Sequence, residues 1–336
     1  MKKKILMIGT GGTIASDKTP DGLVPELDTV QLLQFIPSIA KSCKVTCVQK
    51  YSLDSTNIMS EHWIGIANEI KKNYDKFDGF VICHGTDTMA YTAAALSYLI
   101  QNSSKPIVLT GAQKPIWFDT TDSKQNLTDA FIYACNGTGG VQIVFNGKVI
   151  LGTRARKTYS KSFKAFSSVN YPSLAILQDG KLLQYIKLDN DKPVEFCDTL
   201  NTNVGLLKLV PGIKKEVVKF MLDSYDGLIV ESFGVGGLPA YSDLYETVKD
   251  GAKKGKIIVM TTQVPNEGSD LAVYHVGGHL KNTVKILEAY DMTTESAFAK
   301  LMWIMGKTKE FNEVKKMFYS PVACDILQYG AETHSR

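Results

Sequence analysis

The sequence lacks any long apolar run. Nowhere does it hold the ~20 consecutive apolar residues with which a helix crosses a bilayer. Lys2 to Lys4 precede a short apolar segment, as in a secretory leader, but Gly9 and Thr10 interrupt that segment almost at once. We therefore expect no leader, no association with a membrane and a cytoplasmic location.

Metal-binding patterns are also scarce. The six cysteines are scattered rather than paired at the close spacing of a zinc site, so we expect reduced thiols. His275 and His279 are four residues apart, yet Gly277 and Gly278 between them argue against the helix that such a histidine pair needs. The sequence thus predicts no metal ion.

The charges show no strong excess of one sign. The 38 basic and 34 acidic residues give a net charge of +4, so the overall charge predicts no polyanionic partner. Basic and aromatic side chains do mix between Arg154 and Lys164, a composition found in some nucleic-acid-binding surfaces. We interpret this segment as a solvated face with room for one lysine to turn inward, and expect no nucleic acid as a partner.

Length and composition, 336 residues with 44% hydrophobic, predict two globular domains. Buried strands alternate with amphipathic helices, and the motif FDGFVICHGTDT is echoed later by YDGLIVESFGVGG. We therefore expect an α/β protein with a larger, Rossmann-like N-terminal domain at 1–185. A linker at 186–205 would lead to a smaller, parallel α/β C-terminal domain at 206–336.

Local patterns predict individual elements within the first domain. Helical spacing of apolar residues predicts one helix whose inner face carries Trp63, Ile66, Ala67 and Ile70. The dipeptide Asn146-Gly147, between two apolar runs, predicts a β-hairpin. The polar residues 178–200 are interpreted as irregular.

The stretch from Lys4 to Thr13 is the most informative. An apolar segment that ends at Ile8 predicts a buried strand, and Gly9 to Gly12 let the backbone turn sharply after it. Thr13 then lies at the carboxyl end of the first strand, where α/β folds bind ligands, as a candidate nucleophile; capping of the turn is the structural alternative. The run lacks the third glycine of a dinucleotide fingerprint, because Ile14 stands there, and we expect no cofactor.

A second strand and turn resemble the first in layout. Phe80 to Cys83 predict a buried strand, and His84 to Asp87 predict the turn that leads into a helix. Thr86 and Asp87 would lie at the carboxyl end of this strand. Helix capping is again the structural alternative, because threonine and aspartate are common before a first helical turn.

Two stretches together, GTGGTIAS and HGTDTMAYTA, resemble the signatures of the L-asparaginase family, of its type I cytosolic class. Further blocks follow in the family's order: DSTNIMSEHW, LTGAQKPI, TDSKQN, ESFGVGG and YDMTTESA. The resemblance covers essentially the whole chain and implies hydrolysis of L-asparagine to L-aspartate and ammonia. It also implies two α/β domains in a homodimer or a dimer of dimers, a homotetramer, with active sites completed across the dimer.

The resemblance assigns catalytic roles. By its place in the first signature, Thr13 would be the nucleophile that attacks the amide carbon and forms an acyl-enzyme. Thr86, Asp87 and Lys157 match a second cluster of the family, and a threonine hydroxyl is a poor nucleophile until a base such as a lysine takes its proton. Backbone N–H groups near Gly12 or Thr86 would stabilise the oxyanion.

The resemblance also assigns the groups that bind the substrate. Ser55 and Thr56 match the loop that holds the α-carboxylate, and Asp87 would also hold the α-ammonium. Ala112 would offer its backbone carbonyl to the leaving amide. Such a pocket rejects simple amides, because its buried polar groups would be left unpaired.

One position departs from the family pattern. The segment 14–27, rich in turn residues, is interpreted as a mobile lid, in which many family members carry a tyrosine bonded to the nucleophile. Here Leu23 stands at that position, and leucine neither relays a proton nor orients Thr13. In some type I members a tyrosine from the neighbouring subunit's C-terminal domain takes this place. Tyr290 is the candidate here, with an interface or core aromatic as the alternative.

Two other functions stay open. A glutaminase, or an ammonia-supplying subunit of a tRNA-dependent amidotransferase, would share the chemistry, since asparagine and glutamine differ by one methylene, worth ~1–3 kcal/mol. Such subunits normally carry extra sequence before the first signature, whereas Gly9 stands near the start. A non-catalytic amino-acid sensor would keep the fold, although the presence of Thr13, Thr86, Asp87 and Lys157 argues against lost activity.

Overall fold

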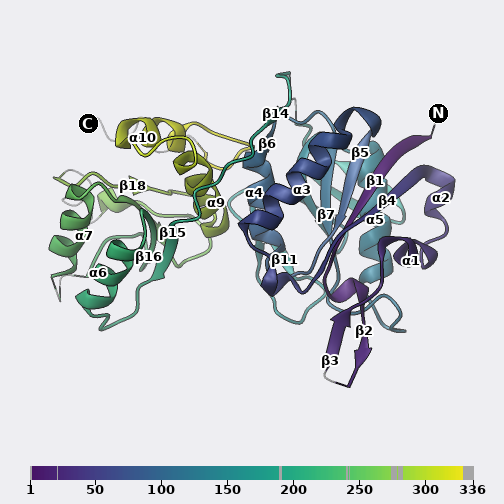
Figure 1. Cartoon of the computed structure of the whole chain (residues 1–336), viewed down its shortest axis with the longest axis horizontal. Helices are drawn as coiled ribbons and strands as arrows, with labels where there is room; N and C mark the ends of the chain where they lie inside the picture. Colours follow the sequence, from purple (N-terminus) through teal and green to yellow (C-terminus); the bar gives the residue numbers. More distant parts are fainter. Residues whose placement is uncertain are drawn as a thin grey trace. The chain divides into compact units, whose positions relative to one another are not determined.

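The computed structural model describes residues 2–20, 22–188, 191–239, 241, 243–273, 278 and 283–327, without the side chains of Lys18, Thr19 and Leu23. The chain divides into two compact units, Met1–Asp198 and Thr199–Arg336, whose ribbons are drawn in Figure 1. His275 and His279, and the side chain of Leu23, thus lie outside the described residues. In the described part of the chain, no helix combines the length and the apolarity needed to cross a membrane.

An eight-stranded sheet forms the middle of the N-terminal unit, in the order β13-β12-β9-β8-β7-β5-β1-β4. Five neighbouring strands run parallel: β4 (Cys43–Leu53), β1 (Lys3–Gly11), β5 (Gly79–Cys83), β7 (Pro106–Thr110) and β8 (Gly140–Phe145). The others continue it antiparallel: β9 (Lys148–Leu151), β12 (Ala175–Gln178) and β13 (Lys181–Gln184). Both β5 and β7 are wholly buried, which is why they read as unbroken apolar runs.

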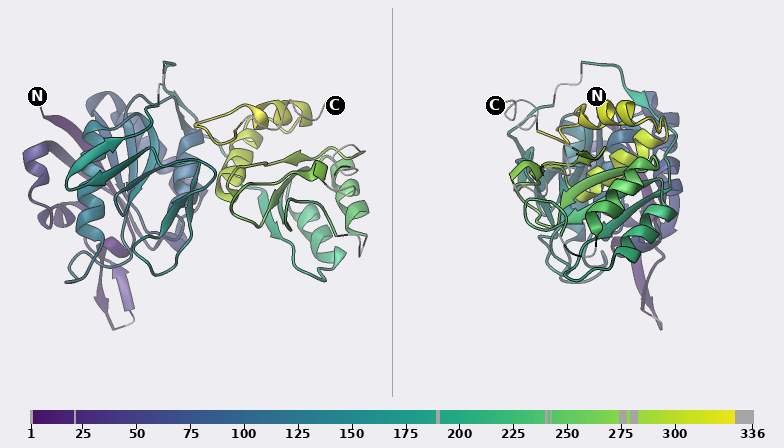
Figure 2. Two further views of the ribbon diagram at one scale, coloured as in Figure 1. Left: turned by 180° about the vertical axis from the view of Figure 1, so that it is seen from behind. Right: turned by 90° about the vertical axis from the view of Figure 1, so that its left-hand side faces the viewer.

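Helices cover both faces of this sheet. On one face α3 (Ser60–Asn73) packs beside α4 (Met89–Leu99), and on the other α5 (Ser123–Asn136) lies beside α2 (Ile39–Ser42), as Figures 1 and 2 show. A shorter helix, α1 (Thr29–Gln34), precedes α2. The predicted inner face of α3 is confirmed, since its buried side chains are Trp63, Ile66, Ala67 and Ile70.

The carboxyl ends of β4, β1, β5 and β7 meet at one edge of the sheet. Four loops begin there, at Gly12 after β1, Asp54 after β4, His84 after β5 and Gly111 after β7. The loop after β4 contains the short turn η2 (Ser55–Asn57). Parallel strands place such loops side by side, so this edge gathers residues that are far apart in sequence.

Two hairpins extend the sheet, and the sequence predicted only one. The β8–β9 turn at Asn146 (φ 49°) and Gly147 (φ 70°) is confirmed, with the left-handed residues that a two-residue hairpin requires. An equivalent turn at Asp179 (φ 50°) and Gly180 (φ 72°) joins β12 to β13, where we expected irregular structure. β13 is an edge strand that alternates exposed and half-buried residues, so it lacks the apolar run that marks a buried strand.

The predicted lid segment also contains strands. Residues after Thr13 form an antiparallel hairpin, β2 (Ser16–Thr19) and β3 (Gly22–Pro25), which projects from the body of the unit in Figure 1. The N–H of Glu26 donates to the carbonyl of Ala15 at 3.0 Å, which ties the end of the hairpin to its start. Closure of this hairpin over Thr13 stays a prediction.

The C-terminal unit is a smaller parallel α/β fold. Its sheet consists of four parallel strands, β15 (Val204–Lys208), β16 (Gly227–Ser232), β17 (Ile257–Thr262) and β18 (Leu287–Glu288). Its longer helices are α6 (Lys215–Ser224), α7 (Leu244–Lys253), α9 (Thr294–Met305) and α10 (Phe311–Tyr319). The predicted fold class, a larger and a smaller α/β domain, is thereby confirmed.

Candidate active site

Two glycine turns touch at the carboxyl edge of the N-terminal sheet. Gly12 follows β1 with a φ of 81°, a left-handed conformation that favours glycine. A Cβ on Gly12 would lie 2.4 Å from the Cα of Gly85, so a side chain is excluded there by space as well. The contact holds the loop that carries Thr13 against the loop that carries Thr86.

Lys157 contacts the second of these loops. It ends β10 (Ala155–Lys157), which pairs antiparallel with β11 (Phe166–Ser168). Its Nζ donates to Thr86 Oγ1 at 2.8 Å and to Asp87 Oδ1 at 2.6 Å. The Lys157 side chain is 17% exposed and that of Asp87 is 55% exposed, so the carboxylate is the partner that faces solvent. Three predicted site residues are therefore brought together.

Ser55 lies at the same edge, whereas the hydrogen bonds of its neighbour Thr56 go to Asp54. The Oγ of Ser55, 2% exposed, accepts from the N–H of Asp87 at 3.2 Å, and its carbonyl accepts from Thr88 Oγ1 at 2.7 Å. Thr56 is exposed, and both its hydroxyl and its N–H donate to Asp54 Oδ1, at 3.1 and 3.0 Å. The hydroxyl of Thr56 thus stabilises its own turn.

The loop after β7 supplies a contact that the sequence analysis missed. Gln113 Oε1 accepts from Thr86 Oγ1 at 3.1 Å, and its Nε2 donates to the carbonyls of Ser160 and Ser162, each at 3.1 Å. Ala112, the predicted contact of the leaving amide, precedes it and is fully buried. The one available signal was the place of Gln113 directly after Ala112 at a strand end.

Asp122 holds this loop in place. Its carboxylate accepts from the N–H groups of Gln113 at 3.0 Å and Lys114 at 3.2 Å, and from Asn126 Nδ2 at 3.1 Å. Burial raises the pKa of Asp122, and these hydrogen bonds act in the opposite direction. Hydrogen bonds made by its backbone N–H and by its side-chain amide therefore hold Gln113 in position.

A fully buried histidine, His84, supports the loop that carries Thr86 through hydrogen bonds. His84 Nδ1 lies 2.7 Å from the carbonyl of Gly85, to which it can only donate, so Nε2 accepts from Thr92 Oγ1 at 3.0 Å. Thr92 in turn accepts from Trp63 Nε1 at 2.9 Å. Burial lowers the pKa of His84 to about 4, which keeps the imidazole neutral and this direction of hydrogen bonding intact.

Capping, the structural alternative for the predicted site threonines, is not what these residues do. Thr13 begins the turn η1 (Thr13–Ala15) and is half-buried, while Gly12 occupies the N-cap position. Thr88 occupies the N-cap position of α4, which leaves Thr86 and Asp87 outside the helix. Their side chains are therefore available for other contacts.

Tyr290 belongs to the C-terminal unit. It is half-buried, and its φ of 49° is uncommon for an aromatic residue. Its ring centroid lies 5.8 Å from that of Tyr319, and its carbonyl accepts from the N–H of Ser269 at 3.0 Å. Its catalytic role stays a prediction.

The chemistry of the cluster is proton transfer and recognition of charged groups. Lys157 supplies an ammonium, Asp87 a solvent-facing carboxylate, and Thr86 and Ser55 supply hydroxyls within one network. Within the described ranges, no three side chains of the metal-binding types lie together in a way that could hold a metal ion. The site therefore suits a polar, zwitterionic substrate and acid–base chemistry.

Comparisons with known proteins cover both units of the chain. The family model described as "Asparaginase, N-terminal" matches residues 4–189, and that described as "Glutaminase/Asparaginase C-terminal domain" matches residues 203–318. An L-asparaginase of Thermococcus kodakarensis is 38% identical over 327 residues, covering 96% of this chain and 99% of that protein. A glutamyl-tRNA(Gln) amidotransferase subunit of Pyrococcus abyssi is 32% identical, covering 97% of this chain and 77% of that protein.

A solved structure is similar throughout its length. The thermostable L-asparaginase from Thermococcus kodakarensis superposes with a TM-score of 0.91 at 36% identity, covering 96% of this chain and 99% of its own. Two family models, one for each unit, together match most of the sequence. The chain therefore belongs to the asparaginase family of enzymes.

Proposed function

We propose that the chain hydrolyses L-asparagine to L-aspartate and ammonia. The observation that carries the proposal is the contact of Lys157 Nζ with Thr86 Oγ1 and Asp87 Oδ1, in a loop that touches the turn before Thr13. A base, a hydroxyl and an accessible carboxylate are the groups that hydrolysis of an amino-acid amide needs. The similarity to L-asparaginases supports the same reaction.

In the proposed mechanism, Oγ of Thr13 attacks the side-chain amide carbon of asparagine. Lys157, in its unprotonated form and acting with Thr86, takes the hydroxyl proton and delivers it to the departing nitrogen, so that ammonia leaves and an ester to Thr13 remains. Water then adds to the ester carbon, aspartate leaves, and Thr13 regains its proton. Backbone N–H groups near Thr86 stabilise the oxyanion of each tetrahedral intermediate, because the N–H of Gly12 already donates to the carbonyl of Leu53 at 2.9 Å.

The same network would bind the two charged ends of the substrate. Ser55 Oγ, which accepts from the N–H of Asp87, keeps its own proton for the α-carboxylate, with Thr56 beside it. Asp87 would receive the α-ammonium on its solvent-facing side, and Ala112 the leaving amide. An ammonium at Asp87 divides that carboxylate between two cations, which weakens its ion pair with Lys157 and eases proton transfer from Lys157 at the step where ammonia leaves.

We extend the proposal to the assembly and the location. Tyr290 would orient the nucleophile of a second copy in a homodimer or dimer of dimers, since Leu23 cannot do so. Size-exclusion chromatography with light scattering tests the assembly. A cytoplasmic location accords with the six cysteines, all of which are present as thiols.

The decisive experiment measures ammonia release from L-asparagine by the purified chain and by Thr13→Ala. We expect loss of at least about 10³-fold in the variant, because its nucleophile is gone. Thr128→Ala, on the exposed side of α5, is the matched control and should keep full activity. Equal activity of parent and Thr13→Ala would assign the nucleophile to another threonine, and Thr86→Ala would be next. A parent that asparagine stabilises against heat without ammonia release would be a sensor.

A second function is favoured by one comparison. The amidotransferase subunit of Pyrococcus abyssi matches almost all of this chain, so ammonia supply to a tRNA-dependent amidotransferase, or a glutaminase activity, competes with the main proposal. Initial rates on L-asparagine and L-glutamine distinguish these functions. A higher kcat/KM for asparagine supports the main proposal, and a higher value for glutamine contradicts it.

A further inference from the structure

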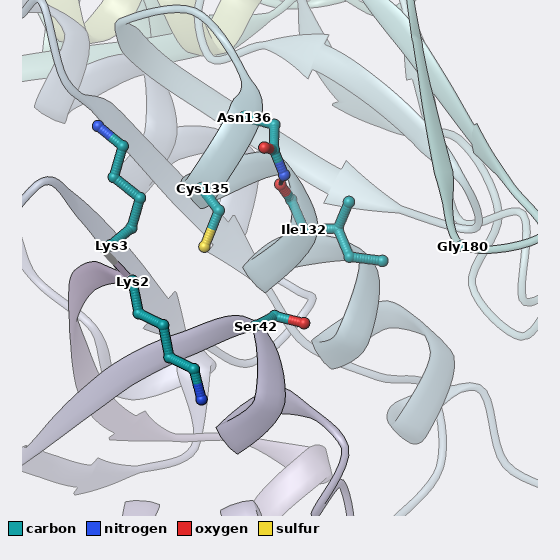
Figure 3. A pocket seen from close by; sticks show the side chains of 7 residues that line it. All are labelled: Lys2, Lys3, Ser42, Ile132, Cys135, Asn136 and Gly180. Carbon is teal, nitrogen blue, oxygen red and sulfur yellow. Dashed lines mark hydrogen bonds between the residues drawn. The ribbon is translucent and has the colours of Figure 1, made fainter.

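A cavity of about 660 Å³ lies at the opposite edge of the N-terminal sheet, where β1 and β4 begin. Its wall includes Lys2, Lys3, Ser42, Cys135 and Asn136. Figure 3 shows the Cys135 sulfur turned toward the side on which the two lysines and Ser42 lie. The cavity thus brings a thiol and two ammonium groups together, at the end of the strands opposite to the Lys157 cluster.

A second cysteine lies behind this wall. Cys43 directly follows Ser42, begins β4 and pairs in register with Lys3 of β1. Its side chain is 2% exposed, whereas that of Cys135 is half-buried and reaches the cavity. The thiol groups of Cys43 and Cys135 interact with each other, and the S–H of Cys43 donates to the carbonyl of Ile39 at 3.8 Å.

The surroundings favour a thiolate at Cys135. The interaction with the Cys43 thiol lowers the pKa of Cys135, and the nearby charge of Lys3 lowers it further, while burial and Asp78 oppose this. The same interaction, together with burial, raises the pKa of Cys43, which therefore holds its proton. Burial raises the pKa of Cys83 to about 12, so that thiol stays protonated.

The lysines determine which reagent fits. Lys2 Nζ donates to the carbonyl of Ala40 at 2.9 Å, and Lys3 Nζ lies 3.7 Å from Asp78 Oδ1, so both ammonium groups are held near the cavity mouth. With Ser42 and Asn136 they make a polar, positively charged entrance. Carboxylate-bearing molecules are attracted to such an entrance.

We propose that Cys135 is a modification site for low-molecular-weight disulfides that carry carboxylates, and that Cys43 resolves the adduct into a Cys43–Cys135 disulfide. The Cys135 thiolate attacks one sulfur of the reagent, forms a mixed disulfide and releases the first thiolate. Cys43 loses its proton to solvent and attacks the sulfur of Cys135, which releases the second thiolate. The protein loses two electrons and two protons, and the reagent becomes two thiols.

Oxidised glutathione, incubated with the reduced full chain and followed by peptide mapping with mass spectrometry, tests the proposal. In the parent we expect a cross-linked peptide pair that contains Cys43 and Cys135 and is two hydrogens lighter than the separate peptides. In Cys43→Ser we expect a stable glutathione adduct on Cys135. In Cys135→Ser we expect neither product in the same time.

Two controls separate reactivity from misfolding and from charge. Cys47, Cys83, Cys197 and Cys324 serve as internal references in every digest, and circular dichroism checks each variant. The double variant Lys2→Gln, Lys3→Gln should slow the reaction with oxidised glutathione by about tenfold at low salt, and leave that with the neutral hydroxyethyl disulfide unchanged. Equal labelling of Cys197 or Cys324, or a folded Cys43→Ser variant without adduct at Cys135, would overturn the proposal.

Discussion

Two of the lysine–aspartate pairs in the described part of the chain have nearly equal length but very different surroundings. In the N-terminal unit Lys157 lies 2.6 Å from Asp87, whose side chain is 55% exposed. In the C-terminal unit Lys300 of α9 lies 2.7 Å from Asp325, and neither side chain is exposed at all. The distance between the charges therefore says little about what a pair does.

The two lysines differ in the group that accepts their second hydrogen bond. Lys157 donates also to the hydroxyl of Thr86, a group that can itself pass a proton on. Lys300 donates also to the carbonyl of Ser320, which only accepts, and burial lowers the pKa of Lys300. A lysine bonded to a hydroxyl, beside a carboxylate open to solvent, suits catalysis; one closed between a carboxylate and a carbonyl suits structure.

The largest expected effect is on activity, in Lys157→Met. Removal of the proposed base should lower kcat for asparagine by about 10³-fold, within the range that general bases contribute. The thermal midpoint should change little, because Asp87 is exposed and returns to water. Ammonia-release kinetics and thermal unfolding measure the two. A variant that keeps activity and loses stability would give Lys157 the role assigned to Lys300.

The opposite outcome is expected for Lys300→Met. It leaves Asp325 buried and charged without its cation, which costs about 3–5 kcal/mol of unfolding free energy. Denaturant unfolding measures this loss, and kcat per folded molecule should stay the same. The double variant Lys300→Met, Asp325→Asn removes both charges and should recover most of the stability. No recovery would mean that packing, rather than charge, sets the cost.

The variant Tyr290→Phe tests whether the Lys157 cluster needs a tyrosine for full activity. Loss of the hydroxyl that would orient Thr13 should lower kcat by about 10–100-fold, while the ring contact with Tyr319 and the fold persist. Steady-state kinetics and circular dichroism measure the two effects. Tyr319→Phe, beside it, is the control for the packing of this ring pair. Near-normal turnover in Tyr290→Phe would remove this residue from the mechanism.

The smallest expected effect is on the pH dependence of stability. It comes from two buried groups, His84 and Asp129, whose hydrogen-bond partners are neutral. The pKa of His84 is lowered to about 4, so its contribution to stability is complete above pH 6.5 and is lost as the pH falls to about 4. The pKa of Asp129 is raised by burial to about 6, so its contribution is complete below pH 3.8 and is lost as the pH rises to about 6. The two dependences oppose each other.

In Asp129→Asn, the pH dependence of stability that comes from His84 should therefore be seen without the opposing one from Asp129. The variant should be more stable than the parent by about 3 kcal/mol at pH 7 and equal to it near pH 3.5, with Gln125 still bonded to the new amide oxygen. Its stability should fall more steeply than that of the parent between pH 6.5 and 4. Urea unfolding at a series of pH values measures this, and parallel curves would contradict it.

Strong local patterns made the fold predictable. Apolar runs marked β1 and β5, the spacing of Trp63 to Ile70 marked α3, and the echo of one strand motif indicated the second unit. The β12–β13 hairpin was missed although Asp179-Gly180 adopts the same left-handed turn as Asn146-Gly147. An edge strand shares its polar alternation with loops, so its turn was the only signal.

The sequence predicted which residues form the candidate site better than it predicted how they contact one another. The second signature pointed to Thr86 and Asp87, and the wider resemblance to the family pointed to Lys157; the fold does bring the three together. Gln113 and His84 could not be assigned, because their roles depend on which loops meet at the sheet edge and on the direction of hydrogen bonds. These are properties of the folded backbone, which residue types alone do not encode.

The crowding of the glycine turns has a genetic consequence. A Cβ on Gly85 would lie 2.6 and 2.7 Å from Oγ and Cβ of Ser55, whereas a Cβ on Gly12 would strike backbone. In a selection for suppressors, loss of function at position 85 therefore has no remedy at position 55, because only glycine removes the Cβ of Ser55 and glycine also removes the hydroxyl proposed to bind the α-carboxylate. Active descendants of this sequence must inherit both glycines unchanged.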